Sequence, residues 1–194
     1  MRVVITGASG NVGTAVIRAL AEEPAVTEVV GLVRRLPSVE LPKTRWVAGD
    51  VGDVDLGPVF RGAGAVIHLA WLIQPARTPR ILWRANVLGS ERVFDAAGAA
   101  AVPRLIYASS VGAYSPHPTS EPVDESWPVG GIRSNLYSLH KSLVERRLDR
   151  VEERYPAMRV SRLRPAFIFQ RSAATGGRRL FLGPLVPSLS LIHI

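Results

Sequence analysis

The chain has 194 residues, a length that corresponds to one sizeable domain. Apolar residues make up 47% and charged residues 21%, which excludes a disordered, collagen-like or coiled-coil chain. The absence of cysteine excludes disulfides, zinc–thiolate centres, iron–sulfur clusters and thiol catalysis. The four histidines lack ligand spacing, so we expect no metal site.

The net charge of +8 comes from one part of the chain. Residues 1–132 hold 12 basic and 12 acidic residues, whereas residues 133–179 hold 12 basic and 4 acidic ones. No helix-turn-helix, zinc finger or aromatic-interleaved basic strand accompanies the surplus, which favours attraction of an anionic cofactor over nucleic-acid binding. The N-terminus lacks a signal-peptide core, and the uncharged residues 180–194 are too short to span a membrane. We therefore expect a cytoplasmic protein without nucleic-acid or membrane partners.

Short β-branched apolar runs alternate with longer helical patterns, as is typical of a parallel sheet covered by helices. The expected strands are 2–6, 27–33, 46–48, 65–70, 105–109 and 159–163, and the expected helices are 11–22, 82–100 and 135–154. The apolar face of the first helix is expected at Val12, Ala15, Val16, Ala19 and Leu20. Right-handed crossovers then give one α/β domain of the Rossmann type, a doubly wound parallel sheet with helices on both faces.

A glycine-rich segment, Thr-Gly-Ala-Ser-Gly-Asn-Val-Gly at 6–13, joins the first strand to the first helix. Glycines at such spacing allow a tight turn, a close approach to a pyrophosphate and tight helix packing, with the phosphates at the helix N-terminus. A purely structural turn is the alternative. The order strand, glycines, helix favours a dinucleotide site.

The end of the second strand bears on the choice of cofactor. An acidic residue there bonds the ribose hydroxyls, whereas an arginine accommodates an extra phosphate. Arg34 and Arg35 occupy this place and favour NADP, with NAD as the alternative; a pair of solvated arginines is the competing interpretation. Asp50, after the third strand, is placed to face the adenine, although a turn-forming Gly-Asp pair explains it nearly as well.

Two further stretches have alternative interpretations. Trp71 and Trp83 bracket a segment that either walls a substrate cleft or packs in the core. Ser109 and Ser110 follow the fifth strand, at the edge where ligands bind in open parallel sheets. A hydroxyl there can polarise a substrate oxygen, or it can serve a turn or cap. No Gly-x-Ser-x-Gly elbow supports nucleophilic hydrolysis.

Tyr137 and Lys141 stand four residues apart in the last predicted helix and therefore share one of its faces. A neighbouring cation stabilises a phenolate, which makes tyrosine a usable acid–base group. The pattern also arises by chance, but 22 of the 24 basic residues are arginine. A lysine here indicates a site that needs a compact ammonium. None of the other three tyrosines has a lysine four residues later.

In this order, the motifs resemble the extended branch of the short-chain dehydrogenase/reductase superfamily, the NAD-dependent epimerase/dehydratase family. The motifs that carry the resemblance are the glycine segment, Gly49-Asp50, His68-Leu69-Ala70, Asn86-Val87-x-Gly89, Ser109-Ser110 with Tyr114, Tyr137-x-x-x-Lys141 and Arg164-Pro165. The resemblance implies that Tyr137 is the acid–base group, that Lys141 binds the nicotinamide ribose and activates the tyrosine, and that Ser110 orients the substrate. The cofactor-binding residues expected from motifs and resemblance are Gly7, Ser9, Gly10, Asn11, Val12, Gly13, Arg34, Arg35, Asp50, Val51, Leu69, Ala70, Asn86, Tyr137, Lys141 and Pro165.

The implied activity is hydride exchange between NAD(P) and a secondary alcohol or ketone of a small-molecule substrate, as in an oxidoreductase or epimerase. The alternative is a non-catalytic NAD(P) sensor on the same fold. A second copy of the chain, bound through the helices near 82–100 and 135–154, is a candidate partner.

Family members continue into a further strand and a substrate-binding lobe, so we expect residues 1–188 to be an NAD(P)-binding domain that lacks most of this lobe. Such a fragment is expected to fold poorly or to bind cofactor without turnover. Phe167-Ile168-Phe169-Gln170 replaces the tyrosine–glycine–proline turn that is usual in the family. The final hexapeptide, 189–194, is what a transposase adaptor end used in sequencing libraries encodes in frame. We expect it to be a non-native tail, with an apolar strand as the alternative.

Overall fold

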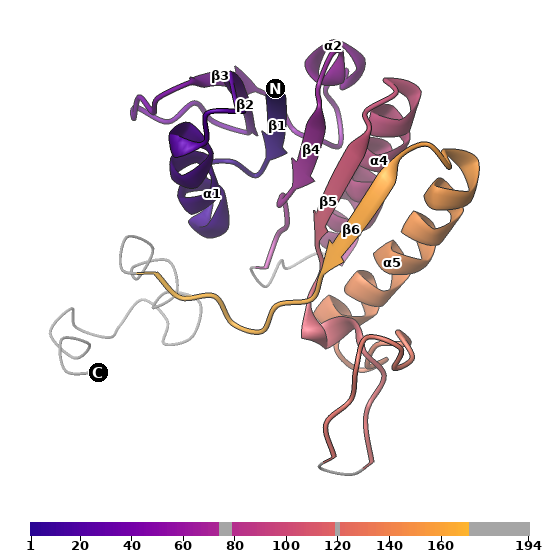
Figure 1. Cartoon of the computed structure of the whole chain (residues 1–194). Coiled ribbons are helices and arrows are strands. Elements are labelled where there is room, and N and C mark those ends of the chain that lie inside the picture. Colours follow the sequence, from indigo (N-terminus) through magenta and orange to yellow (C-terminus); the bar gives the residue numbers. More distant parts are fainter. Residues whose placement is uncertain (74–78, 119–120, 171–194) are drawn as a thin grey trace, which may run out of the picture.

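The computed structural model describes residues 1–73, 79–118 and 121–170. These ranges contain one six-stranded parallel sheet in the order β3-β2-β1-β4-β5-β6 (Figure 1). Its strands are β1 (Arg2–Thr6), β2 (Glu28–Val33), β3 (Thr44–Ala48), β4 (Ala65–His68), β5 (Arg104–Ala108) and β6 (Arg159–Leu163). The predicted doubly wound α/β fold is confirmed. The tail predicted at 189–194 and the domain end at 188 lie outside the described residues.

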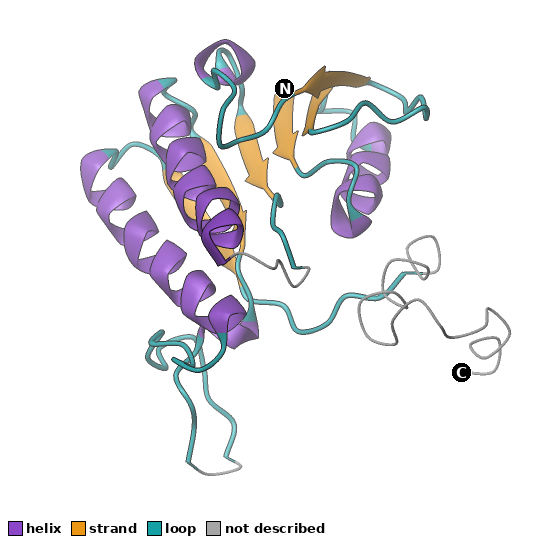
Figure 2. Cartoon of the chain, turned by 180° about the vertical axis from the view of Figure 1, so that it is seen from behind, coloured by secondary structure: helices purple, strands orange, loops and turns teal. Residues whose placement is uncertain are grey.

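Helices cover the sheet on both sides. The helical elements are α1 (Asn11–Glu22), α2 (Gly57–Phe60), α3 (Pro79–Leu82), the π-helix η1 (Trp83–Leu88), α4 (Gly89–Ala99), the 3₁₀-helix η2 (Val111–Ala113) and α5 (Leu136–Arg154). In Figure 2, α4 and α5 lie in front of the sheet and α1 lies behind it. No helix within the described ranges has the length and apolar character needed to cross a membrane.

The core has two halves, because successive side chains of a strand point to opposite faces of the sheet. On β1, Val3 and Ile5 pack with Ile17 of α1, whereas Val4 belongs to the cluster that includes Phe94 of α4 and Leu148 of α5. Burial on both faces explains why the central strands are almost continuously apolar.

Two predictions about helices were wrong in detail. Ala15 and Ala19, expected on the buried face of α1, are exposed, and Ile17 is fully buried instead. The face of α1 is therefore rotated toward its larger apolar side chain, which buries more surface than alanine. The predicted helix 82–100 is divided into the end of α3, η1 and α4. The wider π-helical turn contains Asn86, whose buried side chain bonds a neighbouring loop.

The carboxyl ends of the parallel strands meet at one edge of the sheet, where the chain reverses its direction of winding between β1 and β4. Such a switch point is where open α/β sheets bind ligands. The segment after β6 runs along this edge toward the start of α1 (Figure 1), and Asn11 Nδ2 donates a hydrogen bond to the Ile168 carbonyl at 2.9 Å.

Candidate functional site

The glycine segment forms a cradle between β1, β4 and α1. Gly7 has a φ of +71°, and a Cβ there would lie 2.7 Å from the backbone nitrogen of Ala70. A Cβ on Gly13 would lie 2.5 Å from the Ala8 carbonyl oxygen. Both positions therefore require glycine, one for its backbone conformation and both for the close approach.

The N-terminus of α1 fits an anionic group. No side chain caps this end of the helix, so its first N–H groups are available to an external acceptor. Ser9 and Gly10 are exposed, Val12 is half-buried, and Asn11 Oδ1 is buried without a hydrogen-bond partner among the described residues. A dinucleotide offers phosphate oxygens for the N–H groups and hydroxyl donors for such an acceptor. The cradle thus fits the predicted cofactor.

The residues after β2 and β3 differ in how they face solvent. Arg34 and Arg35 are exposed directly after β2. Asp50 Oδ1 accepts a hydrogen bond from the backbone nitrogen of Gly52 at 2.8 Å, as expected for the turn-forming alternative. The Val51 side chain is buried in the core, so its backbone is the part left for a ligand.

A buried hydrogen-bond chain links β1, β4 and α4. The Ser90 hydroxyl donates to the Asn86 carbonyl at 2.5 Å and therefore accepts from His68 Nε2 at 2.9 Å. His68 Nδ1 then accepts from the Thr6 hydroxyl at 2.6 Å. This direction requires a neutral His68 with its proton on Nε2. Burial, followed by the charge of Lys141, lowers the pKa of His68 to about 3.

We expect the stability of the protein to fall by about 1.4 kcal/mol for each pH unit below 6.5, as far as His68 is concerned. The unfolded chain protonates this histidine below pH 6.5, whereas the folded chain excludes the proton down to about pH 3, so acid favours unfolding. Urea denaturation at pH 7, 6 and 5 measures the slope. Burial also lowers the pKa of His140, so wild type is compared with His68→Gln, which should show a smaller slope. An equal slope in both proteins would contradict the prediction.

Asn86 has a role that its motif did not reveal. Its Oδ1 accepts from the Leu72 backbone nitrogen at 2.7 Å, and its Nδ2 donates to the Leu72 carbonyl at 2.9 Å. The side chain therefore fixes the segment after β4, and its buried amide is used by the protein itself. Ala70 is tied to Thr6 Oγ1 at 3.4 Å, and half-buried Leu69 precedes it.

Ser110 and Tyr137 converge on Gly112. A Cβ on Gly112 would lie 3.3 Å from Tyr137 Cε1 and 3.4 Å from Ser110 Oγ. Ser110 is buried and Tyr137 is 36% exposed, so the pair stands between the interior and solvent. Ser138 of α5 fixes the position of Gly112, because its Oγ donates a hydrogen bond to the Gly112 carbonyl at 2.6 Å. Pro165 contributes by accepting from the Val111 backbone nitrogen at 3.1 Å.

Lys141 lies one turn further along α5 and is only 3% exposed. Its Nζ donates to the Ala108 carbonyl at 2.7 Å and to the Tyr107 hydroxyl at 3.5 Å. The ammonium is 3.6 Å from the centroid of the Trp71 ring and 5.8 Å from that of Tyr137. Burial lowers the pKa of Lys141 to about 7, although the charge of Glu145 opposes the shift.

A buried ion pair lies behind these residues and was missed by the sequence analysis. Glu145 accepts from Ser109 Oγ at 2.5 Å and from Arg164 Nη2 at 2.7 Å. Burial raises the pKa of Glu145, but hydrogen bonds from Arg164 and Ser109 outweigh it and leave the pKa below its usual value. Arg164 also bonds the Tyr114 hydroxyl at 3.0 Å. The signals were the position of Glu145 one turn after Lys141 and the Arg-Pro motif.

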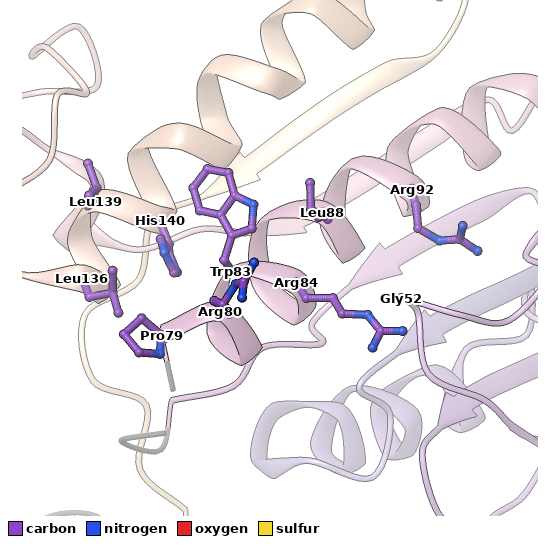
Figure 3. Close-up of a pocket in the computed structure, with 10 residues that line it drawn as sticks. All are labelled: Gly52, Pro79, Arg80, Trp83, Arg84, Leu88, Arg92, Leu136, Leu139 and His140. Atoms are coloured by element: carbon purple, nitrogen blue, oxygen red, sulfur yellow. The ribbon is translucent and has the colours of Figure 1, made fainter. Parts of the chain in front are cut away.

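Two cavities flank the start of α5. One, of about 640 Å³, contains Trp83 and His140 in its wall, together with Arg80, Arg84 and Arg92 (Figure 3). The other, of about 680 Å³, is lined by Leu72, Asn86, Asn135 and Tyr137, among others. The second cavity opens beside the predicted acid–base group. Among the described residues, no three His, Asp or Glu side chains form a group that could hold a metal ion.

Comparison with known proteins agrees with the resemblance. The model of the NAD dependent epimerase/dehydratase family matches residues 3–177. The L-arabinose 1-dehydrogenase (NAD(P)(+)) of Haloferax volcanii is 37% identical over 111 residues, which is 56% of this chain and 41% of that protein. The UDP-glucose 4-epimerase of Mycolicibacterium smegmatis is 31% identical over 140 residues, 66% of this chain and 45% of that protein.

A solved structure also matches. A short-chain dehydrogenase/reductase superfamily protein from Agrobacterium tumefaciens, crystallised with bound NAD, has a TM-score of 0.73 and 32% identity, covering 84% of this chain and 48% of that one. The chain thus spans less than half the length of each of these proteins. The family match covers most of the chain, the fold agrees, and the motifs stand in the expected order. The chain therefore belongs to the NAD-dependent epimerase/dehydratase family.

Proposed function

We propose that the protein is an NAD(P)-dependent oxidoreductase or epimerase that interconverts a secondary alcohol and a ketone with a Ser110–Tyr137–Lys141 site. The observation that carries the proposal is the convergence of Ser110 Oγ and the Tyr137 ring on Gly112, with the Lys141 ammonium 5.8 Å from that ring. The glycine cradle lies next to this site in the chain of contacts, because Gly7 packs against Ala70 and the ring of the following residue, Trp71, contacts the Lys141 ammonium.

The chemical roles follow from the positions. When bound, the nicotinamide supplies or accepts the hydride. The hydroxyl of Tyr137, which lines the cavity, exchanges a proton with the substrate oxygen. Ser110 Oγ accepts a hydrogen bond from the Gly112 nitrogen at 3.1 Å, and its O–H donates a hydrogen bond to the same substrate oxygen without transferring its proton. Lys141 supplies positive charge that favours the phenolate.

The assay that tests the proposal has two parts. Calorimetry measures NADPH and NADH binding, and the nicotinamide absorbance follows turnover with sugar nucleotides and hydroxy-ketone pairs. We expect binding of at least one cofactor and turnover in the protein that carries this chain. Failure to bind either cofactor would overturn the proposal. Binding without turnover in the full-length protein would favour a non-catalytic sensor.

We propose NADP as the preferred cofactor, because Arg34 and Arg35 are exposed beside the predicted ribose position. Replacing Arg34→Asp removes a charge-assisted contact to the extra phosphate and adds repulsion. The ratio of NADPH to NADH affinity should therefore fall by about 10- to 100-fold. Arg104→Asp makes the same charge change at the first residue of β5, at the edge of the sheet opposite to the one where Arg34 follows β2, and should leave the ratio unchanged. Equal ratios in wild type and Arg34→Asp would exclude this role.

The proposal includes a small-molecule substrate in the cavity beside Tyr137 and a second copy of the chain bound along α4 and α5. Both helices carry charged outer faces, and Arg154 pairs with Asp95 across them at 2.7 Å. Sedimentation equilibrium at low and high salt should give the mass of a dimer, and the mass of a monomer at both salt concentrations would contradict this part of the proposal.

A further inference from the structure

The segment 70–72, here called the Trp71 strap, is fixed at both of its ends. The Ala70 nitrogen donates to Thr6 Oγ1, and both backbone groups of Leu72 bond the Asn86 side chain. Ala70 also packs directly against Gly7, where no Cβ fits. The backbone at Trp71 therefore has little freedom, and a change in this place must come from rotation of the indole side chain.

The indole ring lies on the ammonium of Lys141. The distance from Nζ to the ring centroid is 3.6 Å, and the ring meets Tyr137 edge-to-face at 5.9 Å. The other contacts of Nζ are the Ala108 carbonyl and the Tyr107 hydroxyl. Lys141 is only 3% exposed, so these neighbours largely shield the ammonium from solvent.

The position of the ring is not secured by hydrogen bonding. Trp71 Nε1 is buried without a hydrogen-bond partner among the described residues, which is unfavourable for an N–H donor. The ring packs against the core cluster and edge-to-face against Tyr137, and the cation–π contact with Lys141 is the one charged interaction that these contacts add. The ring can therefore leave Lys141 when another group offers the ammonium a better partner, and a rotated indole can then pair its own N–H.

We propose that Trp71 is a gate over Lys141, which the nicotinamide ribose must displace before its hydroxyls reach the ammonium. This inference rests on the proposed function, in which Lys141 binds that ribose. Trp71 would thus lower cofactor affinity while shielding a catalytic lysine from solvent in the free protein. The residue acts on cofactor binding through Lys141 and is a positioning residue.

Cofactor affinity gives the first test. Trp71→Leu keeps an apolar side chain and removes the aromatic face, so NADPH should bind about 3- to 30-fold more tightly by calorimetry. Trp71→Phe keeps a weaker face and should gain less. In a Lys141→Met background, Trp71→Leu should leave affinity within about twofold, because the contact that it relieves is already absent. Weaker or unchanged binding in Trp71→Leu alone would overturn the gate.

Lysine labelling gives a second test that needs no cofactor. Lys43 and Lys141 are the two lysines of the chain, so Lys43→Arg leaves Lys141 as its one lysine side chain. In that background, acetylation of Lys141 by an N-hydroxysuccinimide ester, followed by mass spectrometry, should be several-fold faster in Trp71→Leu and Trp71→Phe than with Trp71 present. Thermal melts check that the variants are folded.

The two tests separate the two proposals. Unchanged labelling in folded variants overturns the gate even if cofactor binds. Faster labelling without any cofactor binding supports the shielding of Lys141 and overturns the proposed cofactor site instead.

Discussion

Tyr137→Phe should retain cofactor binding and lose turnover by about 10²- to 10⁴-fold, the usual contribution of a positioned acid–base group. The substitution deletes one hydroxyl and keeps the ring. The ring lies beside Gly112, where an added Cβ would be 3.3 Å from Tyr137 Cε1, and it meets the Trp71 ring edge-to-face at 5.9 Å between centroids, so neither contact uses the hydroxyl. The fold and the cavity should therefore be unchanged. Single-turnover measurement of nicotinamide oxidation gives the rate, and calorimetry gives the affinity.

Tyr155→Phe is the matched control. It deletes the same hydroxyl at the end of α5, where the ring packs against Gly98, far along the helix from Tyr137. Turnover of this variant should equal that of wild type. Equal turnover in Tyr137→Phe would remove the catalytic role and leave the sensor alternative. A matching fall in both variants would instead indicate a general loss of structure.

The architecture could be predicted because it depends on local spacing. The central strands β1, β2 and β4 are short apolar runs, and α1 has apolar residues at helical spacing. The exceptions lie where tertiary contacts decide. The division of 82–100 into three helical elements follows from Asn86 reaching Leu72, a contact across 14 positions that no helical period contains. Ala15 and Ile17 point to nearly opposite sides of α1, and the side that carries the larger Ile17 faces the sheet.

The candidate site could be predicted in part for the same reason. Tyr137 and Lys141 lie on one helix, so their spacing fixes their relation, and Ser110 follows from the rule that strand ends meet. Trp71 had two open interpretations, since its contact with Lys141 joins residues 70 positions apart. The pairing of Glu145 with Arg164 could not be predicted, because the position of Glu145 after Lys141 and the Arg-Pro motif each mark one residue and name no partner for it. Arg164 comes within reach of Glu145 only when β6 pairs with β5 in the observed register, in which Leu163 lies beside Ala108, and the sequence alone does not give this register.

The ion pair between Glu145 and Arg164 should make a large contribution to the stability of the fold. Glu145→Gln should lower the free energy of unfolding by about 3–5 kcal/mol, the usual result of removing one partner of a buried ion pair. The Glu145 side chain is 2% exposed and links α5 to Ser109, which follows β5, and to Arg164, which follows β6. A glutamine keeps the shape but leaves the guanidinium of Arg164 without its counter-charge.

Urea denaturation at pH 7 measures the loss, and Glu153→Gln is the matched control, since Glu153 is exposed on the same helix and should change stability by less than about 0.5 kcal/mol. Adding Arg164→Met to Glu145→Gln should recover part of the loss, because no unpaired charge then remains in the interior. A loss below about 1 kcal/mol for Glu145→Gln alone would contradict the prediction.

Because the pKa of Glu145 is below its usual value, its stabilising effect is complete above the unfolded pKa of 4.5 and is lost as the pH falls through the lower folded pKa. The Glu145→Gln protein should therefore lose less stability than wild type on acidification below pH 4.5, which separates the ion pair from a purely steric role of the side chain.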